Sequence, residues 1–379
     1  MKKIYLSSPH MGGEEQKYIN EAFETNWIAP LGPNVNQFEK EICEYTKAKY
    51  ATALVSGTSA IHLGLKLLEV DKGDYVFCSS LTFSASANPI IYQGAIPVFI
   101  DSEYESFNMC PKSLEKAFEI ANKTNKMPKA VVVVHLYGQS ADMDKIKEIC
   151  DKYSVAILED SAESLGTLYK GRHSGTIGDI GIYSFNGNKI ITTSGGGMMV
   201  SNKEEYTKKA LFMATQSREN QRHYEHKELG YNYRMSNVVA GIGCGQMKVL
   251  DQRIKKKKEI YETYKMAFKD IKEIEMMPIC EYNEPNYWLS VITIDKNSSV
   301  KPIDIMIMLE NENIEARPVW KPMHLQPFFK EYDFVSIQET ISVGEDLFNR
   351  GICLPSDTKN TDEDMDRIIN TIKRCFEKN

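Results

Sequence analysis

An apolar run, an amphipathic segment and a second apolar run constrain the fold of this chain more than any other feature of its sequence. The run KAVVVVHL (129–136) has the composition of a strand that is buried on both faces of a parallel sheet. DMDKIKEICDKY (142–153) has the apolar spacing of a helix, and VAILED (155–160) follows as the next strand. Strand, helix and strand at this spacing imply a right-handed crossover in a mostly parallel sheet. Ligand-binding loops are then expected at the C-terminal ends of the strands.

The same alternation runs through the first two-thirds of the chain and changes near Asp251. Further strands are predicted at 50–56, 75–80, 95–101 and 181–185, with helices over 57–70 and from about Ser84. After Asp251 the pattern predicts one long helix, a strand at 287–295, a helix over 301–313 and a terminal helix from about Thr361. The sequence therefore predicts an α/β fold with a large, mostly parallel sheet domain (1–250) and a smaller C-terminal α+β domain (251–379).

Composition excludes several classes of function. The 379 residues carry 46 Lys+Arg and 52 Asp+Glu, and the net charge of -6 provides no general attraction for nucleic acid or an anionic membrane surface. No segment has the apolar length of a membrane helix or of a signal peptide, so we expect a cytoplasmic protein. The eight cysteines are dispersed without a CxxC pair, and His223 and His226 have no ligand pattern around them, so no metal site is expected.

Three candidate sites follow strand ends. Gly57, Thr58 and Ser59 lie where a strand meets a helix N-terminus, which is suited to a phosphate group but equally to an ordinary helix cap. Asp160 ends an apolar strand, where its carboxylate needs either a cationic partner, such as a protonated ring nitrogen, or a helix to cap.

Lys189 follows Ser184, the end of the strand GIYSF, by five residues. A partly desolvated lysine at a sheet edge becomes a nucleophile for a carbonyl, whereas most lysines are only solvated. The glycines at 195–197 match neither phosphate-loop pattern, and they indicate a tight turn or close packing beside Lys189.

In order along the chain, six segments resemble the DegT/DnrJ/EryC1/StrS family of pyridoxal-phosphate-dependent sugar aminotransferases. They are SGTSAIHL, the TF of SLTFSASANPI, EDSAESLG, YSFNGNKIITTSGGGM, GYNYRMSN and RPVWKPMHLQPF. The resemblance runs from SSPHMGGEE to CLPSDT and so covers nearly the whole chain. It implies the fold type I, aspartate-aminotransferase-like architecture and pyridoxal 5'-phosphate as cofactor.

The resemblance also implies a role for each motif residue. Lys189 would hold the cofactor as a Schiff base and move the proton during catalysis, while Asp160 would pair with the pyridine nitrogen. Phe83 would stack on the ring, and the Ser184 hydroxyl would help to hold the phosphate. The phosphate would also be held by Gly57, Thr58, Ser59 and, from a second subunit, Asn232. A homodimer with active sites at the subunit interface is therefore expected.

Two positions depart from the usual pattern of the family. Glu163 stands where many relatives carry Gln beside the cofactor's 3'-oxygen, so an acid here would have to be protonated or partnered. Phe83 replaces a Trp found in some members, which keeps the stacking face but loses the indole N–H.

The implied reaction moves the amine of L-glutamate to C4 of a nucleotide-linked 4-keto-6-deoxy sugar, which the motif variants indicate to be a UDP-N-acetyl sugar for surface-glycan biosynthesis. GDP-perosamine synthesis and amination at C3 of a dTDP-sugar are the alternatives within this chemistry. A non-catalytic cofactor-binding or nucleotide-sugar-binding regulator is the alternative outside it. The candidates for substrate binding are Arg234, which would meet an anionic group across the dimer interface, Trp320, Met323 and His324. For Trp320 and Met323 the alternative is a packing role.

Overall fold

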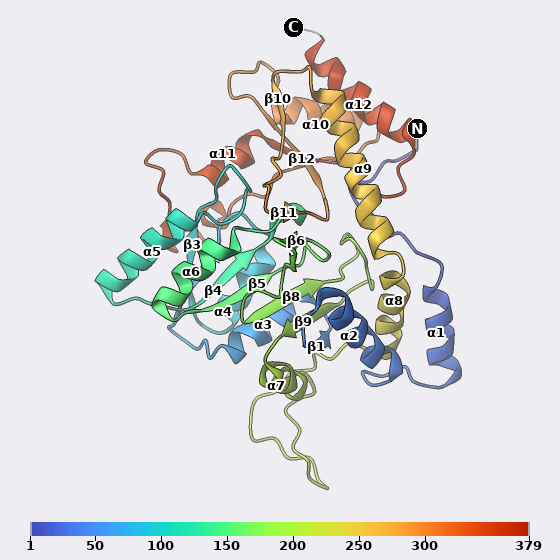
Figure 1. The fold of residues 1–379 in the computed structure, drawn as a ribbon, viewed down its shortest axis with the longest axis vertical. Helices are drawn as coiled ribbons and strands as arrows, with labels where there is room; N and C mark the ends of the chain where they lie inside the picture. Colours follow the sequence, from blue (N-terminus) through green and yellow to red (C-terminus); the bar gives the residue numbers. More distant parts are fainter. Residues whose placement is uncertain (1, 378–379) are drawn as a thin grey trace.

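The computed structural model describes residues 2–377, which contain one large sheet and two smaller ones (Figure 1). In spatial order the large sheet consists of β1 (Tyr50–Leu54), β9 (Gly197–Ser201), β8 (Ile180–Ser184), β5 (Ala156–Asp160), β4 (Pro128–Val134), β2 (Tyr75–Ser79), β3 (Ile96–Ile100) and β14 (Phe334–Val335). Strand β9 is antiparallel to β1 and β8, and the other neighbouring pairs are parallel. The predicted α/β class with a mostly parallel sheet is confirmed.

Helices cover both faces of this sheet (Figure 1). One apolar core joins the sheet to α3 (Gly57–Leu67), α4 (Asn88–Tyr92) and α7 (Glu204–Ala214). On the opposite face the helices are α5 (Pro111–Thr124), α6 (Met143–Tyr153), α2 (Pro33–Thr46) and α8 (Asn237–Met247). Helix α1 (Glu15–Glu24) packs beside α8. Burial on both faces explains why the central strands are continuously apolar.

A second core is formed by the C-terminal third of the chain together with the second half of the long helix α9 (Leu250–Phe268; Figure 1). Its sheet has the order β10 (Ile274–Met276), β12 (Ser290–Ile294), β15 (Gly351–Leu354) and β13 (Arg317–Pro318). The helices of this region are α10 (Pro302–Asn311), α11 (Val343–Arg350) and α12 (Asp362–Phe376). A small third sheet consists of β11 (Asn283–Glu284), β6 (Leu168–Tyr169) and β7 (Arg172–His173).

The division at residue 250 remains a prediction, because two segments cross it. Strand β14, from the C-terminal third, pairs with β3 of the large sheet, and Ile4 bridges to Ile314 within the second core. The predicted helix from Ser84 is interrupted. It consists of the 3-10 turn η1 (Ser84–Ser86) followed by α4, whose first turn contains Pro89. Within residues 2–377, the structure contains no helix that is long and apolar enough to cross a membrane.

Candidate active site

A cavity of about 310 Å³ opens at the C-terminal edge of the large sheet. Its walls come from the last residues of β4, β5 and β8 and from the segments that follow β1, β2, β5 and β8, as expected for a parallel sheet, together with Trp288 and Trp320. Eight of the predicted site residues line it: Gly57, Thr58, Phe83, Asp160, Glu163, Ser184, Lys189 and Trp320. Residues that lie up to 263 positions apart in the sequence (Gly57 and Trp320) are therefore brought together at this edge.

The N-terminus of α3 forms one end of the cavity. Ser56 caps the helix, its hydroxyl accepting the Ser59 N–H at 3.0 Å, while the Ser59 hydroxyl donates to the Ser56 carbonyl at 2.8 Å. Ser59 is thus occupied in the capping box and does not line the cavity, whereas Gly57 and Thr58 do. The N–H groups of a first helical turn have no carbonyl partners within the helix, so Gly57 and Thr58 are suited to a phosphate. A side chain at position 57 would come within 3.1 Å of Ser184 Cβ, which explains the glycine.

The triple glycine supports this end of the cavity from the side. A side chain at Gly197 would overlap the carbonyl of Ser56, and one at Gly196 would come within 2.8 Å of the Met235 methyl. Gly195 and Gly196 also line the cavity. These glycines therefore permit close packing, as the sequence indicates, but the atoms that they contact belong to the helix N-terminus and to neighbouring loops and not to Lys189.

Asp160 is held in place by two donors at the end of β5. The Ser86 hydroxyl donates to Oδ2 at 2.6 Å, and the Ala162 N–H lies 3.2 Å from Oδ1. Asp160 is buried, and both of these donors are uncharged groups. A buried carboxylate is costly without a cationic partner, so its position in the cavity wall fits a protonated ring nitrogen of a ligand.

Lys189 extends from the loop after β8 into the same cavity, and its side chain is 13% exposed. The Lys189 ammonium lies 3.6 Å from Glu163 Oε1 and 4.2 Å from the centroid of the Trp288 ring. A carboxylate on one side and an aromatic face on the other therefore hold the amine.

Glu163 differs from Asp160 in its electrostatics. Burial raises the pKa of the Glu163 carboxyl above its ordinary value, and the nearby charge of Asp160 adds to this increase. The Lys189 ammonium and the Tyr137 N–H at 2.8 Å favour the ionised form and counteract only part of the increase. The partner that the sequence requires for an acid at position 163 is therefore Lys189.

The structure adds two aromatic residues that sequence reasoning missed. Trp288 lies just before β12. Its indole N–H donates to the carbonyl of Asn188, the residue before Lys189, at 2.7 Å. Tyr137 stacks between Trp288 and Trp320, at centroid distances of 6.4 and 6.2 Å. In the sequence Trp288 is part of an apolar strand, and nothing in that pattern distinguishes a core aromatic residue from one that faces a site.

The backbone of Trp288 is anchored by a buried amine. Lys257 of α9 donates to the carbonyls of Trp288 at 2.9 Å and Ser356 at 2.8 Å. Burial lowers the pKa of Lys257 to about 7. The long helix thus connects the second core to the aromatic face below Lys189.

The predicted substrate-binding residues have different surroundings. Trp320 lines the Lys189 cavity and also an adjoining cavity of about 720 Å³, which Met323 reaches as a buried side chain. His324 lies outside both, bonded through Nδ1 to Ser80 at 2.7 Å and stacked on Phe334, and burial lowers its pKa to about 4.

Two further predicted residues lie away from the cavity of their own chain. Arg234 is buried and pairs with Glu39 and with the Ala53 carbonyl at 3.1 Å. Asn232 is exposed and forms an isolated backbone bridge with Thr215. Contacts of Arg234 and Asn232 with a second subunit remain predictions.

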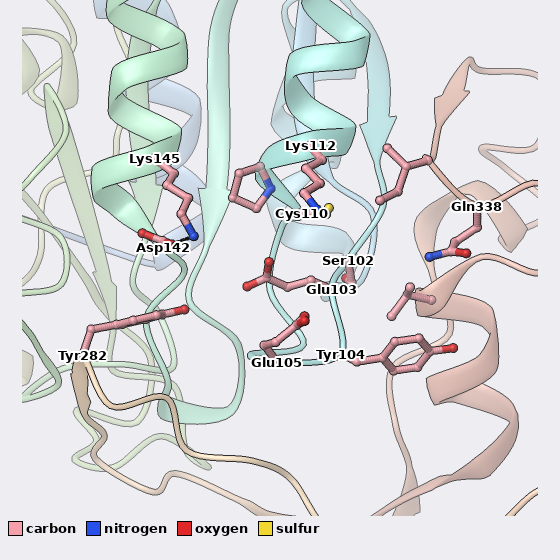
Figure 2. A pocket seen from close by; sticks show the side chains of 13 residues that line it. Ser102, Glu103, Tyr104, Glu105, Cys110, Lys112, Asp142, Lys145, Tyr282 and Gln338 are labelled. Atoms are coloured by element: carbon pink, nitrogen blue, oxygen red, sulfur yellow. Dashed lines mark ion pairs between the residues drawn. The ribbon is translucent and has the colours of Figure 1, made fainter.

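Another hollow, of about 380 Å³, lies between the β3–α5 connection and the start of α6 (Figure 2). Its charged side chains are of both signs, and Asp142 and Lys145 pair there at 2.8 Å. None of the predicted site residues lines it. Among residues 2–377 no cluster of three or more His, Cys, Asp or Glu side chains is suited to a metal ion, and His223 pairs with Glu225 instead.

The cavity combines an amine beside a carboxylate, a second buried carboxylate and a helix N-terminus, and these are features expected of a pyridoxal-phosphate-dependent transferase on this fold. The sequence profile of the DegT/DnrJ/EryC1/StrS aminotransferase family matches residues 9–373, and the chain belongs to that family. It is therefore a sugar aminotransferase with fold type I and pyridoxal phosphate as cofactor.

Individual relatives agree over nearly the full length. EpsN of Bacillus subtilis (strain 168), provisionally named as a pyridoxal phosphate-dependent aminotransferase, is 55% identical over 99% of this chain and 96% of its own. The GDP-perosamine synthase of Vibrio cholerae is 36% identical over 98% of this chain and 99% of its own. The structure of Spr1654 from Streptococcus pneumoniae, provisionally a sugar aminotransferase, in its pyridoxal phosphate form has a TM-score of 0.90. It is 26% identical and covers 100% of this chain and 99% of that one.

Proposed function

We propose that this protein transfers the amino group of L-glutamate to C4 of a nucleotide-linked 4-keto-6-deoxy sugar, specifically a UDP-linked N-acetyl sugar, for surface-glycan biosynthesis. The observation that carries the proposal is the cavity of about 720 Å³ that adjoins the Lys189 cavity. The two share Thr82, Phe83, Asn188, Trp288 and Trp320. A volume of this size suits a ligand much larger than an amino acid.

The polar groups of the adjoining cavity also favour an anionic, hydroxyl-rich substrate. Arg317, Lys321 and Glu315 line it together with Ser7 and Gln326. Two cations against one carboxylate leave this wall net positive, as a diphosphate linkage requires. Relatives named for sugar chemistry support the same class, among them GDP-perosamine synthases and the spore coat polysaccharide biosynthesis protein SpsC of Bacillus subtilis, at 33% identity.

Each residue of the Lys189 cavity then has a task. Bound pyridoxal phosphate supplies a carbonyl carbon for amines and an electron-withdrawing ring. Asp160 would hold a proton at the ring nitrogen, Phe83 would cover a ring face, and the Ser184 hydroxyl with the Gly57 and Thr58 amides would hold the phosphate. Lys189 would hold the cofactor through its amine and would move the proton to and from the reacting substrate carbon.

The proposed assembly is a homodimer. In it the Asn232 amide completes the phosphate site of the neighbouring subunit, and Arg234 approaches that subunit's substrate. Exposure of Asn232 supports this role, because its own chain leaves the side chain available. Arg234 would have to exchange part of its pairing with Glu39 for the substrate.

A panel of keto sugars with L-glutamate tests the proposal. UDP-linked, GDP-linked and dTDP-linked 4-keto-6-deoxy sugars and a dTDP-linked 3-keto sugar are each incubated with enzyme, and amination is read by mass spectrometry. We expect the UDP-linked N-acetyl sugar to be aminated fastest, and Lys189→Ala to leave no product from any of them. Preference for the 3-keto sugar would refute C4 amination.

A GDP-linked 4-keto-6-deoxy sugar is the second candidate, because two GDP-perosamine synthases are 36% and 35% identical to this chain. The same panel distinguishes it. A non-catalytic regulator is tested with L-glutamate alone. An enzyme releases a stoichiometric burst of 2-oxoglutarate in the absence of sugar, and a regulator releases none.

A further inference from the structure

Glu163 and Lys189 form a buried acid–base pair in the wall of the cofactor cavity. Their charged atoms are 3.6 Å apart, and the Lys189 and Glu163 side chains are 13% and 5% exposed. The other Glu163 oxygen accepts the Tyr137 N–H at 2.8 Å, which fixes the carboxyl group and leaves Oε1 towards the amine. We propose that Glu163 controls the protonation of Lys189: it stabilises the ammonium form in the free protein and takes up its proton when Lys189 attacks a carbonyl.

The surroundings of the pair restrict the proton to these two groups. Asp160, the other charged group that faces Glu163, is occupied by Ser86 and the Ala162 N–H. Burial raises the pKa of the Tyr137 phenol well above its ordinary value and that of the Cys353 thiol to about 12, so both stay neutral near pH 7. Burial also raises the pKa of Glu163, so this carboxyl group accepts a proton more readily than an exposed glutamate does.

The step balances within the pair. A proton leaves the Lys189 ammonium for the Glu163 carboxylate, giving a neutral amine and a neutral acid. The amine nitrogen forms a bond to the carbonyl carbon of the cofactor's aldehyde, and the aldehyde oxygen leaves as water. The neutral Glu163 acid can then donate a hydrogen bond, which suits a phenolate oxygen on the cofactor ring. The inference depends on the cofactor of the family and is independent of which sugar is the substrate.

The test uses the protein without cofactor and measures the reactivity of one amine. Acetic anhydride labels neutral amines. Peptide mass spectrometry gives the labelling rate of Lys189 relative to exposed lysines between about pH 6 and pH 10. Glu163→Gln keeps the shape and an acceptor for the Tyr137 N–H but removes the charge that stabilises the ammonium. We expect Lys189 in Glu163→Gln to be labelled about tenfold faster at pH 7 than in the wild type.

Two variants separate this role from a structural one. Glu163→Asp keeps the charge and should stay near the wild-type rate, and Glu103→Gln removes a carboxylate from the separate hollow of Figure 2 and should change nothing. Equal labelling in Glu163→Gln and wild type would overturn the proposal, as would a similar increase in Glu103→Gln. The rate of cofactor loading should show the matching change, with its dependence on pH weakened in Glu163→Gln. None of these measurements uses a sugar, so they do not depend on the outcome of the substrate panel.

Discussion

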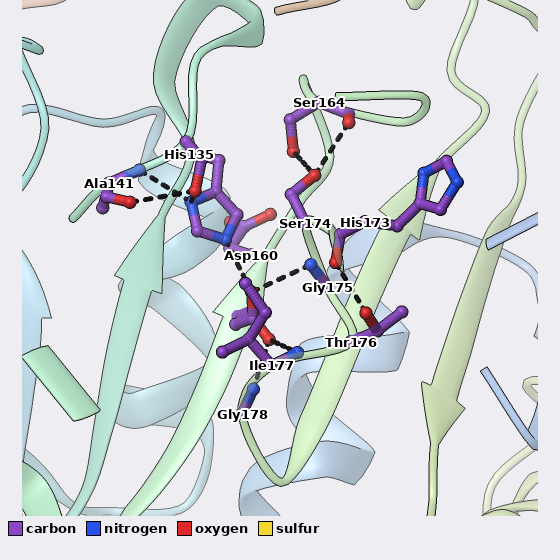
Figure 3. Close-up of polar contacts among 12 residues, drawn as sticks. His135, Ala141, Asp160, Ser164, His173, Ser174, Gly175, Thr176, Ile177 and Gly178 are labelled. Carbon is purple, nitrogen blue, oxygen red and sulfur yellow. Dashed lines mark hydrogen bonds and ion pairs between the residues drawn. The ribbon is translucent and has the colours of Figure 1, made fainter. Parts of the chain in front are cut away.

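Glu159 and Glu163 are buried glutamates four residues apart, but they differ in their hydrogen-bond partners and in the direction of their pKa shifts. Glu159 is completely buried and accepts hydrogen bonds from His135 Nε2 at 2.8 Å and from the N–H groups of Gly175, at 2.9 Å, and Ile177, at 2.6 Å. Figure 3 shows this loop beside His135 at the strand ends. The Ala141 N–H donates to His135 Nδ1, so Nε2 carries the hydrogen that points to Glu159.

Hydrogen bonds reverse the effect of burial on the pKa of Glu159 but not on that of Glu163. Burial raises the pKa of both, but the His135 bond and the backbone N–H groups of the loop lower the pKa of Glu159 below its ordinary value. Glu163 has fewer such donors, and its pKa stays raised. Burial alone therefore does not identify a functional carboxylate. The informative feature is a carboxyl group with an acceptor atom directed at an open cavity.

The largest expected effect concerns Asp160, the neighbour of Glu159 on β5 and part of the cavity wall. Asp160→Asn keeps the shape but cannot hold a proton at a ring nitrogen. We expect kcat to fall by about 10²- to 10⁴-fold. The thermal unfolding midpoint should stay within a few degrees of the wild type. A loss of folding with little loss of kcat would place Asp160 with Glu159 as a structural carboxylate.

The next effect is on stability and separates the two glutamates directly. Glu159→Gln places an amide NH₂ among donors and leaves buried N–H groups of the 175–178 loop without an acceptor. We expect the free energy of unfolding to fall by about 3 kcal/mol, measured by denaturant titration. Glu163→Gln is the matched control and should change it by less than about 1 kcal/mol. Equal losses would show that both glutamates are structural.

The stabilities of these two variants relative to the wild type should depend on pH in opposite ways. A carboxyl group whose pKa is lowered by folding stabilises the protein above its unfolded pKa, and this contribution is lost as the pH falls through the folded value. The difference in unfolding free energy between the wild type and Glu159→Gln should therefore shrink as the pH falls below about 4.5, the ordinary pKa of Glu. The pKa of Glu163 is shifted in the opposite direction, so Glu163→Gln should gain relative stability as the pH rises.

Local patterns were sufficient for much of the fold. The strands at 75–80, 95–101 and 155–160 and the helices at 142–153 and 301–313 are found within two residues of their predicted bounds. Helices α1, α2, α7 and α8 were not predicted. The antiparallel direction of β9 and the pairing of β14 with β3 depend on contacts between distant segments, which periodicity does not encode.

The site shows the same limit. Gly57, Asp160 and Lys189 follow strand ends, so topology alone places them at one edge of the sheet. Ser59, in contrast, has the right position in the sequence but is occupied by the capping box. Trp288 has no sequence signal because its role arises from packing of the segment before β12 against Tyr137 and the loop before Lys189.

The smallest expected effect tests how much this distant aromatic residue contributes. Trp288→Phe keeps a ring face below Lys189 but loses the N–H that donates to the Asn188 carbonyl, while the Ser7 hydroxyl still donates there at 3.1 Å. We expect a cost of about 1 kcal/mol, seen as a less than tenfold decrease in kcat. Trp288→Leu also removes the face that stabilises the ammonium and should cost about another 1 kcal/mol. If the two variants behave alike, the ring face does not act on Lys189, and of its two neighbours only the carboxylate of Glu163 controls the amine.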